Sequence, residues 1–479
     1  MIRPTHLNKA GVYRDERIAY WEAYQRRRPG RYYHEEIRRI YQFLVPPGRS
    51  VLELGCGTGD LLAGLLPSRG VGVDFSPRRV EAARARHPGL TIIAADVHQL
   101  SLDEKFDYII LSDLVNDLWD VQLVLEKVTS LCHAGTRVVL NNYSRIWELP
   151  LKTVRALGLT HPYLAQNWFT VADLENLFYL SGFEVIRKWG EILLPACVPG
   201  LSTFFNSFVA RAAPFQFFAL TNFLVARPDP RSETRQRPAD APVVSVIVPA
   251  RNEAGNINEI LERVPEMGAG TELIFVEGNS TDDTWQAIEK AIAGGSRSNV
   301  RLLRQPGKGK GDAVRAGFAA ATGEILMILD ADLTVPPEDL PRFYDALRKG
   351  KGEFINGVRL VYPMEHHAMQ FFNLLANRFF GLAFSWLLGQ PIKDTLCGTK
   401  ALRKSDYDAI AANRAYFGDF DPFGDFDLLF GAAKLNLRIV DIPIRYAERT
   451  YGQTNISRWR HGWLLFRMMF FALRRLKFF

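Results

Sequence analysis

The stretch Glu324-Ile-Leu-Met-Ile-Leu-Asp-Ala-Asp332 decides how the second half of this chain folds. Its run of apolar residues is typical of a strand buried inside a parallel sheet. Because side chains alternate along an extended chain, Asp330 and Asp332 lie on the same side of the strand end. Two carboxylates so spaced can hold a divalent cation such as Mg²⁺ or Mn²⁺. The alternative interpretation is a solvated turn after a buried strand.

Other strands expected in the same half are also followed by polar side chains. Strands are expected at Val243–Pro249, Glu272–Val276, Val300–Leu303 and Glu324–Asp330. The polar residues that follow the first two are Asn252, Glu253, Glu277 and Ser280. A basic glycine-rich loop around Lys310, Gly307-Lys-Gly-Lys-Gly-Asp-Ala313, precedes a helix and suits a phosphate. Polar residues gathered at one sheet edge indicate a nucleotide site rather than unrelated turns.

This order of motifs resembles the family-2 glycosyltransferases of the GT-A fold, over roughly residues 243–455. Within that family it is similar to the polyprenyl- and dolichyl-phosphate sugar synthases. The resemblance implies inverting transfer of a sugar from a GDP- or UDP-linked donor. It implies a donor site at Pro249, Asn252, Glu253, Glu277, Ser280, Lys310 and Asp330. It also implies that Asp330 and Asp332 carry Mg²⁺ or Mn²⁺, with Asp332 and Arg403 among the catalytic residues.

Two kinds of acceptor stay open. Basic residues could bind the phosphate of a polyprenyl phosphate through charge-assisted hydrogen bonds, namely Arg359, Lys400, Arg403 and Arg449. A phosphate monoester is already anionic, whereas a glycan hydroxyl needs a general base, for which Asp425 and Asp427 are the candidates. The chain departs from the family at Glu277-Gly278, where two aspartates are usual, and at Asn455, where a lysine is usual. The second departure favours the hydroxyl acceptor.

The first half is organised around Val51-Leu-Glu-Leu-Gly-Cys-Gly-Thr-Gly59, a strand that runs into a glycine-rich turn. Glycines let a ligand approach the backbone closely. The next strands end at Asp74 and at Asp96, and a later strand ends at Ser112-Asp113. A carboxylate after the second strand can accept hydrogen bonds from both hydroxyls of a ribose.

This set resembles a class I S-adenosylmethionine-dependent methyltransferase over roughly residues 30–227. The resemblance implies that Asp74 holds the ribose, that Asp96 holds the adenine amino group, and that the glycine loop holds the methionine part. Ser112-Asp113 would line the place where the acceptor meets the methyl group. The full set expected to bind S-adenosyl-L-methionine is Glu53, Gly55, Gly57, Gly59, Asp74, Asp96 and Asp113. The methyl acceptor is not indicated, and a purely nucleoside-binding or regulatory module is the alternative.

The sequence therefore predicts two α/β domains, a Rossmann-like methyltransferase sheet and a GT-A sheet. A polar, proline-rich segment separates them. The expected boundaries are 1–228 for the first domain, 229–242 for the linker and 243–479 for the second. In the first domain, strands are expected at Val51–Leu54, Val71–Asp74, Thr91–Ala95, Phe106–Ser112 and Thr136–Asn141.

Bulk properties limit the partners and the location. A net charge of +7 over 479 residues is too small and too dispersed to favour nucleic acid. The 4 cysteines form no CxxC pair, and the first residues lack the apolar core of a signal peptide, so we expect a cytoplasmic protein. No apolar segment is long enough to span a bilayer. The basic, aromatic segment Trp459–Phe479 resembles an interfacial helix and predicts peripheral contact with the inner membrane face; docking on its own domain is the alternative.

Overall fold

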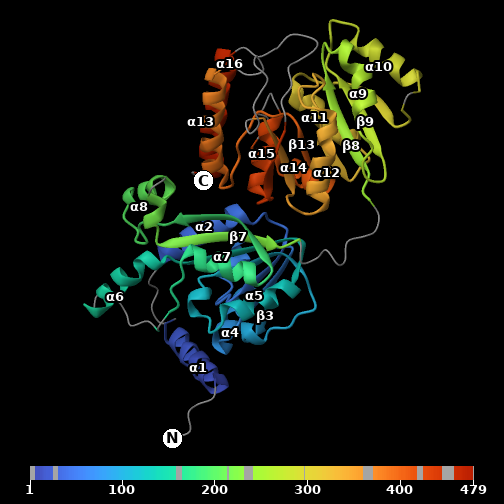
Figure 1. Ribbon diagram of the computed structural model, residues 1–479. Coiled ribbons are helices and arrows are strands. Elements are labelled where there is room, and N and C mark those ends of the chain that lie inside the picture. Colours follow the sequence, from blue (N-terminus) through green and yellow to red (C-terminus); the bar gives the residue numbers. More distant parts are fainter. Residues whose placement is uncertain are drawn as a thin grey trace. The chain divides into compact units, whose positions relative to one another are not determined.

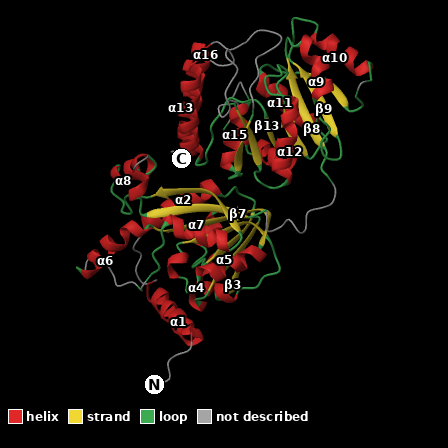
Figure 2. Ribbon diagram, viewed as in Figure 1, coloured by secondary structure: helices red, strands yellow, loops and turns green. Residues whose placement is uncertain are grey.

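The computed structural model describes residues 6–24, 31–157, 164, 166–212, 215–230, 241–295, 297–359, 371–417, 424–444 and 458–477. The chain divides into two compact units, one up to residue 232 and one from residue 233 (Figure 1). Each unit contains one mixed sheet together with the helices that pack on it (Figure 2). Two α/β domains were expected, and this fold class is confirmed.

The sheet of the first unit has seven strands in the order β3-β2-β1-β4-β5-β7-β6. The strands β1 to β5 are parallel, whereas β7 runs antiparallel to both β5 and β6. Their bounds are β1 (Ser50–Leu54), β2 (Arg69–Asp74), β3 (Thr91–Ala94), β4 (Phe106–Ser112), β5 (Cys132–Tyr143), β6 (Phe183–Glu191) and β7 (Thr221–Pro228). The parallel register brings the ends of β1, β2 and β4 to one edge of the sheet.

The helices of this unit start where the sequence offers caps. Ser76 Oγ accepts a hydrogen bond from Arg79 N and Pro77 follows it, so α4 begins as expected of an N-cap with a first-turn proline. Thr170 and Asp173 form a capping box at the start of α7. The α-helices are α1 (His6–Tyr24), α2 (Arg31–Leu44), α3 (Asp60–Gly64), α4 (Pro77–Arg86), α5 (Val121–Ser130), α6 (Glu148–Ala156), α7 (Val171–Leu180) and α8 (Leu201–Phe204).

The sheet of the second unit also has seven strands, in the order β10-β9-β8-β11-β13-β12-β14. Here β8 to β11 are parallel, and β13 is antiparallel to its neighbours β11 and β12. Their bounds are β8 (Val244–Ala250), β9 (Thr271–Glu277), β10 (Val300–Arg304), β11 (Ile325–Ile328), β12 (Phe354–Val358), β13 (Lys400–Arg403) and β14 (Ile439–Pro443).

The α-helices of the second unit are α9 (Ile257–Arg263), α10 (Thr284–Ala293), α11 (Lys310–Ala320), α12 (Leu340–Arg348), α13 (Phe371–Leu388), α14 (Lys404–Ala412), α15 (Asp425–Lys434) and α16 (Arg458–Ala472). The last of these lies beside α13, as Figure 1 shows. Phe466 of α16 packs against Phe379 and Phe380 of α13, with ring centroids 6.2 and 5.2 Å apart. Among the described residues, no helix is long and apolar enough to cross a membrane.

Apolar side chains of β1 and β11 lie in the hydrophobic cores of the two units. Ile325 and Met327 are completely buried between β8 and β13, and Leu52 and Leu54 are buried in the first unit. Burying one such side chain stabilises a fold by about 1.5–3 kcal/mol. These strands therefore fix the two sheets, and the polar residues that follow them are held at the sheet edges.

Candidate functional sites

The glycine loop after β1 requires glycine at its turns. Gly55, Gly57 and Gly59 have φ angles of 73°, 54° and 74°, in the left-handed region that favours glycine. A Cβ atom on Gly55 would also lie 2.8 Å from Leu114 Cδ1. The turn after β1 therefore needs glycine at these positions.

Asp74, at the end of β2, fixes the loop. Its Oδ2 accepts a hydrogen bond from Gly57 N at 2.8 Å and its Oδ1 accepts one from Ser76 N at 2.9 Å. Ser76 Oγ in turn binds Glu22 Oε1 of α1 at 3.1 Å. The expected ribose residue is thus tied to the glycine loop and, through Ser76, to the first helix.

Glu53 lies beneath the loop. Its Oε2 accepts a hydrogen bond from Leu62 N of α3 at 3.1 Å, and the residue is only 3% exposed. Burial raises the pKa of Glu53 to about 8. Glu53 therefore supports the start of α3 within the expected site, and its carboxyl is largely protonated at neutral pH.

Asp96 follows β3 and binds His98. Its Oδ1 accepts His98 N at 2.9 Å and lies 2.7 Å from His98 Nδ1. Burial opposes ionisation, yet these contacts with His98 hold the pKa of Asp96 below its ordinary value. The other ring nitrogen, His98 Nε2, accepts Asp120 N at 3.2 Å.

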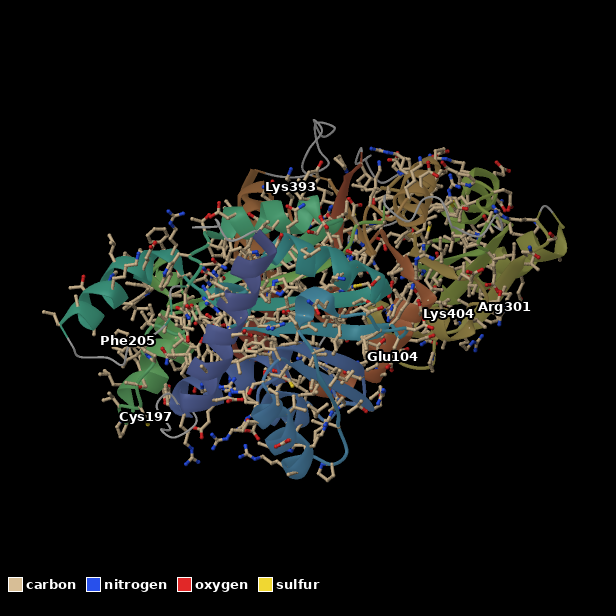
Figure 3. The ribbon with its side chains drawn as sticks, turned by 90° about the horizontal axis from the view of Figure 1, so that it is seen from below. Glu104, Cys197, Phe205, Arg301, Lys393 and Lys404 are labelled. Atoms are coloured by element: carbon tan, nitrogen blue, oxygen red, sulfur yellow. The ribbon has the colours of Figure 1, made fainter. Side chains whose placement is uncertain are left out.

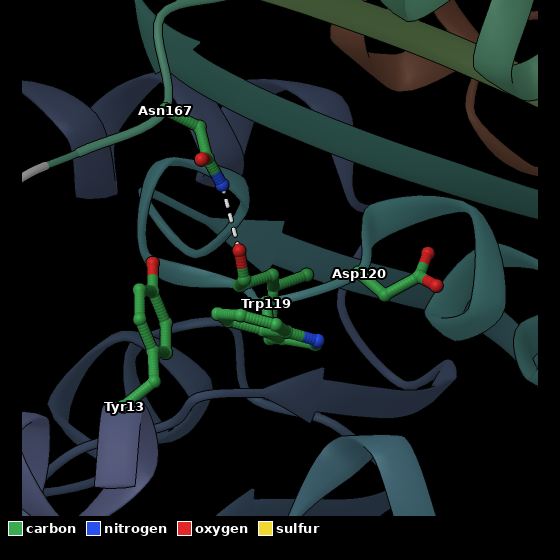
Figure 4. Close-up of a pocket in the computed structure, with 5 residues that line it drawn as sticks. Tyr13, Trp119, Asp120 and Asn167 are labelled. Carbon is green, nitrogen blue, oxygen red and sulfur yellow. Dashed lines mark hydrogen bonds between the residues drawn. The ribbon is translucent and has the colours of Figure 1, made fainter. Parts of the chain in front are cut away.

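A pocket of about 350 Å³ lies next to this chain of contacts (Figure 4). Its lining residues are Tyr13, Leu118, Trp119, Asp120 and Asn167. The rings of Tyr13 and Trp119 meet edge to face at 5.1 Å, and Asn167 Nδ2 donates to Leu118 O at 2.6 Å. Because Asp120 N donates to His98, the pocket adjoins Asp96, the residue expected to bind adenine. This pocket could not be predicted from the sequence, because its residues come from three separate segments without a motif.

In the second unit, Lys310 and Asp330 form a direct ion pair at the end of β11. A Cβ atom on Gly398 would overlap both Asp330 Oδ2 and Lys310 Nζ, so the loop before β13 closes tightly over the pair. Burial lowers the pKa of Lys310, but the nearby carboxylates of Asp330, Asp425 and Asp332 raise it above its ordinary value. The structure thus gathers Lys310 and three carboxylates at this edge, and Lys400 binds one of them, Asp425.

The two carboxylates of the predicted metal site fit a cation that also binds a phosphate. Asp332 Oδ1 accepts Thr334 N at 3.2 Å and Thr334 Oγ1 at 2.7 Å. Within the described part of the chain, no three His, Cys, Asp or Glu side chains cluster to hold a metal by themselves. Mg²⁺ is usually bound by one or two carboxylates, with waters and substrate phosphates as its other ligands. The donor set at Asp330 and Asp332 agrees with that chemistry.

The residues expected around the nucleoside are joined to one another. Asn252, with a φ of 60°, donates its N–H to Ser280 Oγ at 3.0 Å. Ser280 N donates to Glu277 Oε1 at 2.5 Å. Asn256 Nδ2 bridges Glu253 Oε2 at 2.7 Å and Ala331 O at 3.0 Å. Pro249 lies near the end of β8, and the loop that follows this strand is therefore linked to the loop after β9 and to the Asp-Ala-Asp segment.

Two of the expected phosphate ligands already bind carboxylates. Arg359 Nε and Nη2 lie 2.7 and 2.9 Å from the two oxygens of Asp394. Lys400, whose side chain is 0% exposed, donates to Asp425 Oδ1 at 2.8 Å and to Cys397 O. Asp427, the other candidate base, binds Arg414 Nε at 2.9 Å. Asp425 and Cys397 thus take two of the three N–H donors of Lys400.

Arg403 does not join this group, which corrects the expected catalytic and acceptor role. It pairs with Ile325, at the start of β11, because β13 runs antiparallel to β11. Asp330 lies five residues after Ile325. At the rise per residue of a strand, this separates Asp330 from the Ile325–Arg403 pair by roughly 16 Å. The next residue, Lys404, donates to Ala321 O at that opposite edge, and Arg301 donates to the adjoining Ala320 O; both residues are labelled in Figure 3. Arg449 and Asn455 lie outside the described residues.

Comparison with known families gives one match in each unit. Residues 24–188 match the family described as methyltransferase domain. Residues 245–412 match the family described as glycosyl transferase family 2. Both resemblances inferred from the motifs are thereby confirmed at the level of the domain family.

Curated relatives cover part of the chain. It is 30% identical to a dolichol-phosphate mannosyltransferase of Pyrococcus furiosus over 222 residues, which are 45% of this chain and 59% of the relative. It is 27% identical to an undecaprenyl-phosphate 4-deoxy-4-formamido-L-arabinose transferase of Klebsiella pneumoniae, over 45% of this chain and 62% of the relative. The chain thus spans about three fifths of the length of these relatives.

Solved structures similar to each unit are distant. A putative methyltransferase of Haloferax volcanii, solved with its activator, is 19% identical, with 46% of this chain and 97% of that chain covered and a TM-score of 0.34. A glucosyl-3-phosphoglycerate synthase of Mycobacterium tuberculosis is 20% identical, with 50% and 86% covered and a TM-score of 0.36.

Proposed function

Because the chain carries a methyltransferase domain followed by a glycosyl transferase family 2 domain, we propose that it is a bifunctional enzyme. The second unit transfers a sugar, with inversion, from a GDP- or UDP-linked donor to a polyprenyl phosphate. The first unit transfers a methyl group from S-adenosyl-L-methionine to the same glycan or to its acceptor.

The observation that carries the sugar transfer is the joined strand-end network of the second unit. Asn256 links the loop that holds Glu253 to Ala331, between the two aspartates. A donor bound across this network would meet nucleoside-binding residues and diphosphate-binding residues on connected loops. Asp330 and Asp332 would hold Mg²⁺ or Mn²⁺, which when bound neutralises the departing diphosphate. Incubation with GDP- and UDP-sugars, with and without a chelator, tests this through the nucleotide released; release unaffected by chelation would contradict it.

The lipid acceptor is favoured by relatives whose names specify polyprenyl-phosphate substrates. A phosphate acceptor is already ionised, so its attack needs no base from the protein. A glycan hydroxyl is the second candidate, and one observation favours it. Arg359 and Lys400, expected to bind the phosphate, are both engaged by carboxylates.

Replacing Asp74 with alanine is expected to weaken S-adenosyl-L-methionine binding at least about 100-fold. The change removes a carboxylate placed for the ribose and also frees Gly57 N, so the glycine loop loses its fixed shape. Isothermal titration calorimetry measures this directly. Asp103→Asn, an exposed carboxylate of the same unit, is the matched control. Undiminished affinity in the Asp74 variant would refute the site.

We further propose peripheral contact of the second unit with an anionic membrane surface. The paired helices α13 and α16 expose apolar side chains, with Leu382 at 75% and Trp463 at 74% exposure. The other large apolar side chains exposed there are Phe379, Phe466 and Phe470. Arg467, Arg474 and Arg475 are exposed on the same C-terminal segment. Aromatic and basic side chains together are typical of interfacial helices.

The double variant Trp463→Ser/Phe470→Ser is expected to lower binding to phosphatidylglycerol vesicles about tenfold, because two inserted side chains are lost. Vesicle co-sedimentation measures it, and Leu66→Asn, an isolated exposed residue of the first unit, is the control. Binding that survives the double change would locate the contact elsewhere. The exposed phenylalanines of the first unit, such as Phe217, would then be the next to replace.

A further inference from the structure

Asp113, immediately after β4, has an unusual backbone and fixed contacts. Its φ is 52°, a conformation that few residues other than glycine adopt and that often marks functional positions. Tyr33 Oη donates to Asp113 Oδ1 at 2.9 Å, and Asn141 Nδ2 donates to the same oxygen at 2.6 Å. One oxygen of this carboxylate is therefore held from α2 and from β5.

The two donors are themselves fixed. Tyr41 Oη donates to Asn141 Oδ1 at 2.8 Å, which directs the amide nitrogen of Asn141 toward Asp113. Tyr33 lies 3.3 Å from Thr221 Oγ1 and stacks on Tyr143, with ring centroids 5.9 Å apart. Both Tyr33 and Tyr41 are buried. A network drawn from α2, β5 and β7 thus holds one carboxylate rigidly.

The second oxygen of Asp113 is available. Both hydrogen bonds go to Oδ1, and no residue in the described ranges donates to Oδ2. The residue is only partly buried, so a ligand can reach it. Burial raises the pKa of Asp113 to about 7, with Tyr33 and Asn141 opposing the rise and Asp117 adding to it.

We propose that Asp113 is the general base of methyl transfer and that the acceptor is a hydroxyl group, such as one on a sugar. This inference rests on the proposed methyltransferase activity. The proton of the hydroxyl passes to Asp113 Oδ2 while the acceptor oxygen bonds to the methyl carbon. The carbon–sulfur bond of the sulfonium breaks, and its electron pair stays on sulfur. A carboxylate acceptor would need no base, and a carboxylate held beside it would repel it.

The other ionisable groups around Asp113 do not share this role. Asp117, on the turn after β4, lies 3.7 Å from Arg17 of α1. Burial raises the pKa of Tyr33 and of Tyr41 well above 10, so both stay protonated and can donate. Burial, with Arg79, lowers the pKa of His34, the neighbour of Tyr33 on α2. Burial also raises the pKa of Asp117, but Arg17 lies beside that carboxylate. Among these groups, Asp113 is the carboxylate that Tyr33 and Asn141 hold through one oxygen while its other oxygen stays open to a ligand.

The first experiment needs no acceptor. Full-length protein with ¹³Cγ-labelled aspartate is titrated by NMR, and Asp113→Asn identifies the signal. Asparagine tolerates a left-handed backbone, so this variant is expected to fold. Because Asp113 also belongs to the set expected to bind S-adenosyl-L-methionine, cofactor affinity is measured separately by isothermal titration calorimetry, and methyl transfer is compared at saturating cofactor. The signal is expected to titrate near pH 7, and at higher pH in Tyr33→Phe, because the lost hydrogen bond favoured the ionised form. A signal that titrates near 4 in both proteins overturns the proposal.

The second experiment measures methyl transfer against pH. The probes are the product lipid of the second unit and methyl pyranosides, with 2-amino-2-deoxy pyranosides as amine acceptors. Below pH 7 the wild-type rate on hydroxyls is expected to fall about tenfold per pH unit, and Asp113→Asn should lose about 10²–10⁴-fold at pH 8. Tyr33→Phe should move the acid limb to higher pH. Transfer to amines alone, or no transfer to hydroxyls by protein that binds S-adenosyl-L-methionine, overturns the inference but not the cofactor site. Absence of S-adenosyl-L-methionine binding would overturn both.

Discussion

Asp332→Asn is expected to lower the rate of sugar transfer by about 10³-fold while leaving the second unit folded. The amide keeps the size of the side chain and can still accept from Thr334, so the local hydrogen bonds at 3.2 and 2.7 Å are retained. What is lost is one of the two negative charges that would hold the divalent cation. The measurement is product formation at saturating donor with Mg²⁺ or Mn²⁺.

A matched control separates the metal role from a general loss of charge. Asp345 lies on α12 of the same unit, and its side chain is 47% exposed in a surface ion pair with Lys349. Asp345→Asn is expected to change the rate less than twofold, because surface ion pairs contribute about 0–1 kcal/mol. Activity that persists in Asp332→Asn, or falls equally in Asp345→Asn, would remove the metal role.

Lys400→Met is expected to destabilise the second unit by about 3–5 kcal/mol. Lys400 is fully buried, and its removal would leave the carboxylate of Asp425 without its cation inside the protein. The free energy is measured by hydrogen exchange of the amides in β12 and β13 as denaturant is added. Lys349→Met is the control. It breaks the surface ion pair with Asp345, whose 2.7 Å length is close to the 2.8 Å of the buried pair, and it is expected to lower the free energy of unfolding by less than about 1 kcal/mol.

A second substitution tests whether the unpaired charge causes the loss. In Lys400→Met/Asp425→Leu neither member of this pair carries a charge, so most of the lost stability should return. If Lys400→Met costs no more than Lys349→Met, the buried pair does not stabilise the unit. If the double variant is as unstable as the single one, the loss comes from packing instead.

The sequence predicted most of the central strands because their apolar runs are buried on both faces. The strand that ends before Asp330 and the one that ends at Asp74 appear almost as expected. The strands β6, β7, β12, β13 and β14 were missed. The shortest, β13, is only four residues, Lys400–Arg403, in a segment of small and polar residues. Such a strand forms because neighbouring strands pair with it, and its own composition does not reveal that.

That missed strand explains why part of the acceptor site was placed wrongly. Lys400 and Arg403 are three residues apart, yet the antiparallel course of β13 carries Arg403 away from the Asp330 edge. Contacts between residues far apart in the sequence could not be predicted either. Tyr33 and Asp113 are 80 residues apart, and nothing near either residue indicates the hydrogen bond between them. A motif determines which functional groups lie at a strand end, whereas strand pairing and sheet topology determine which residues surround them.

Transfer of a sugar to lipid tests the central claim most directly. Full-length protein is incubated with a polyprenyl phosphate in phosphatidylglycerol vesicles, Mg²⁺ or Mn²⁺, and a panel of GDP- and UDP-sugars. The organic phase is then analysed by mass spectrometry, with the Asp332→Asn protein as the negative control. We predict a sugar-phosphate lipid that forms only with wild-type protein and metal. An organic phase without product, with nucleotide released only when a glycan is added, would contradict the lipid acceptor and establish the hydroxyl acceptor instead.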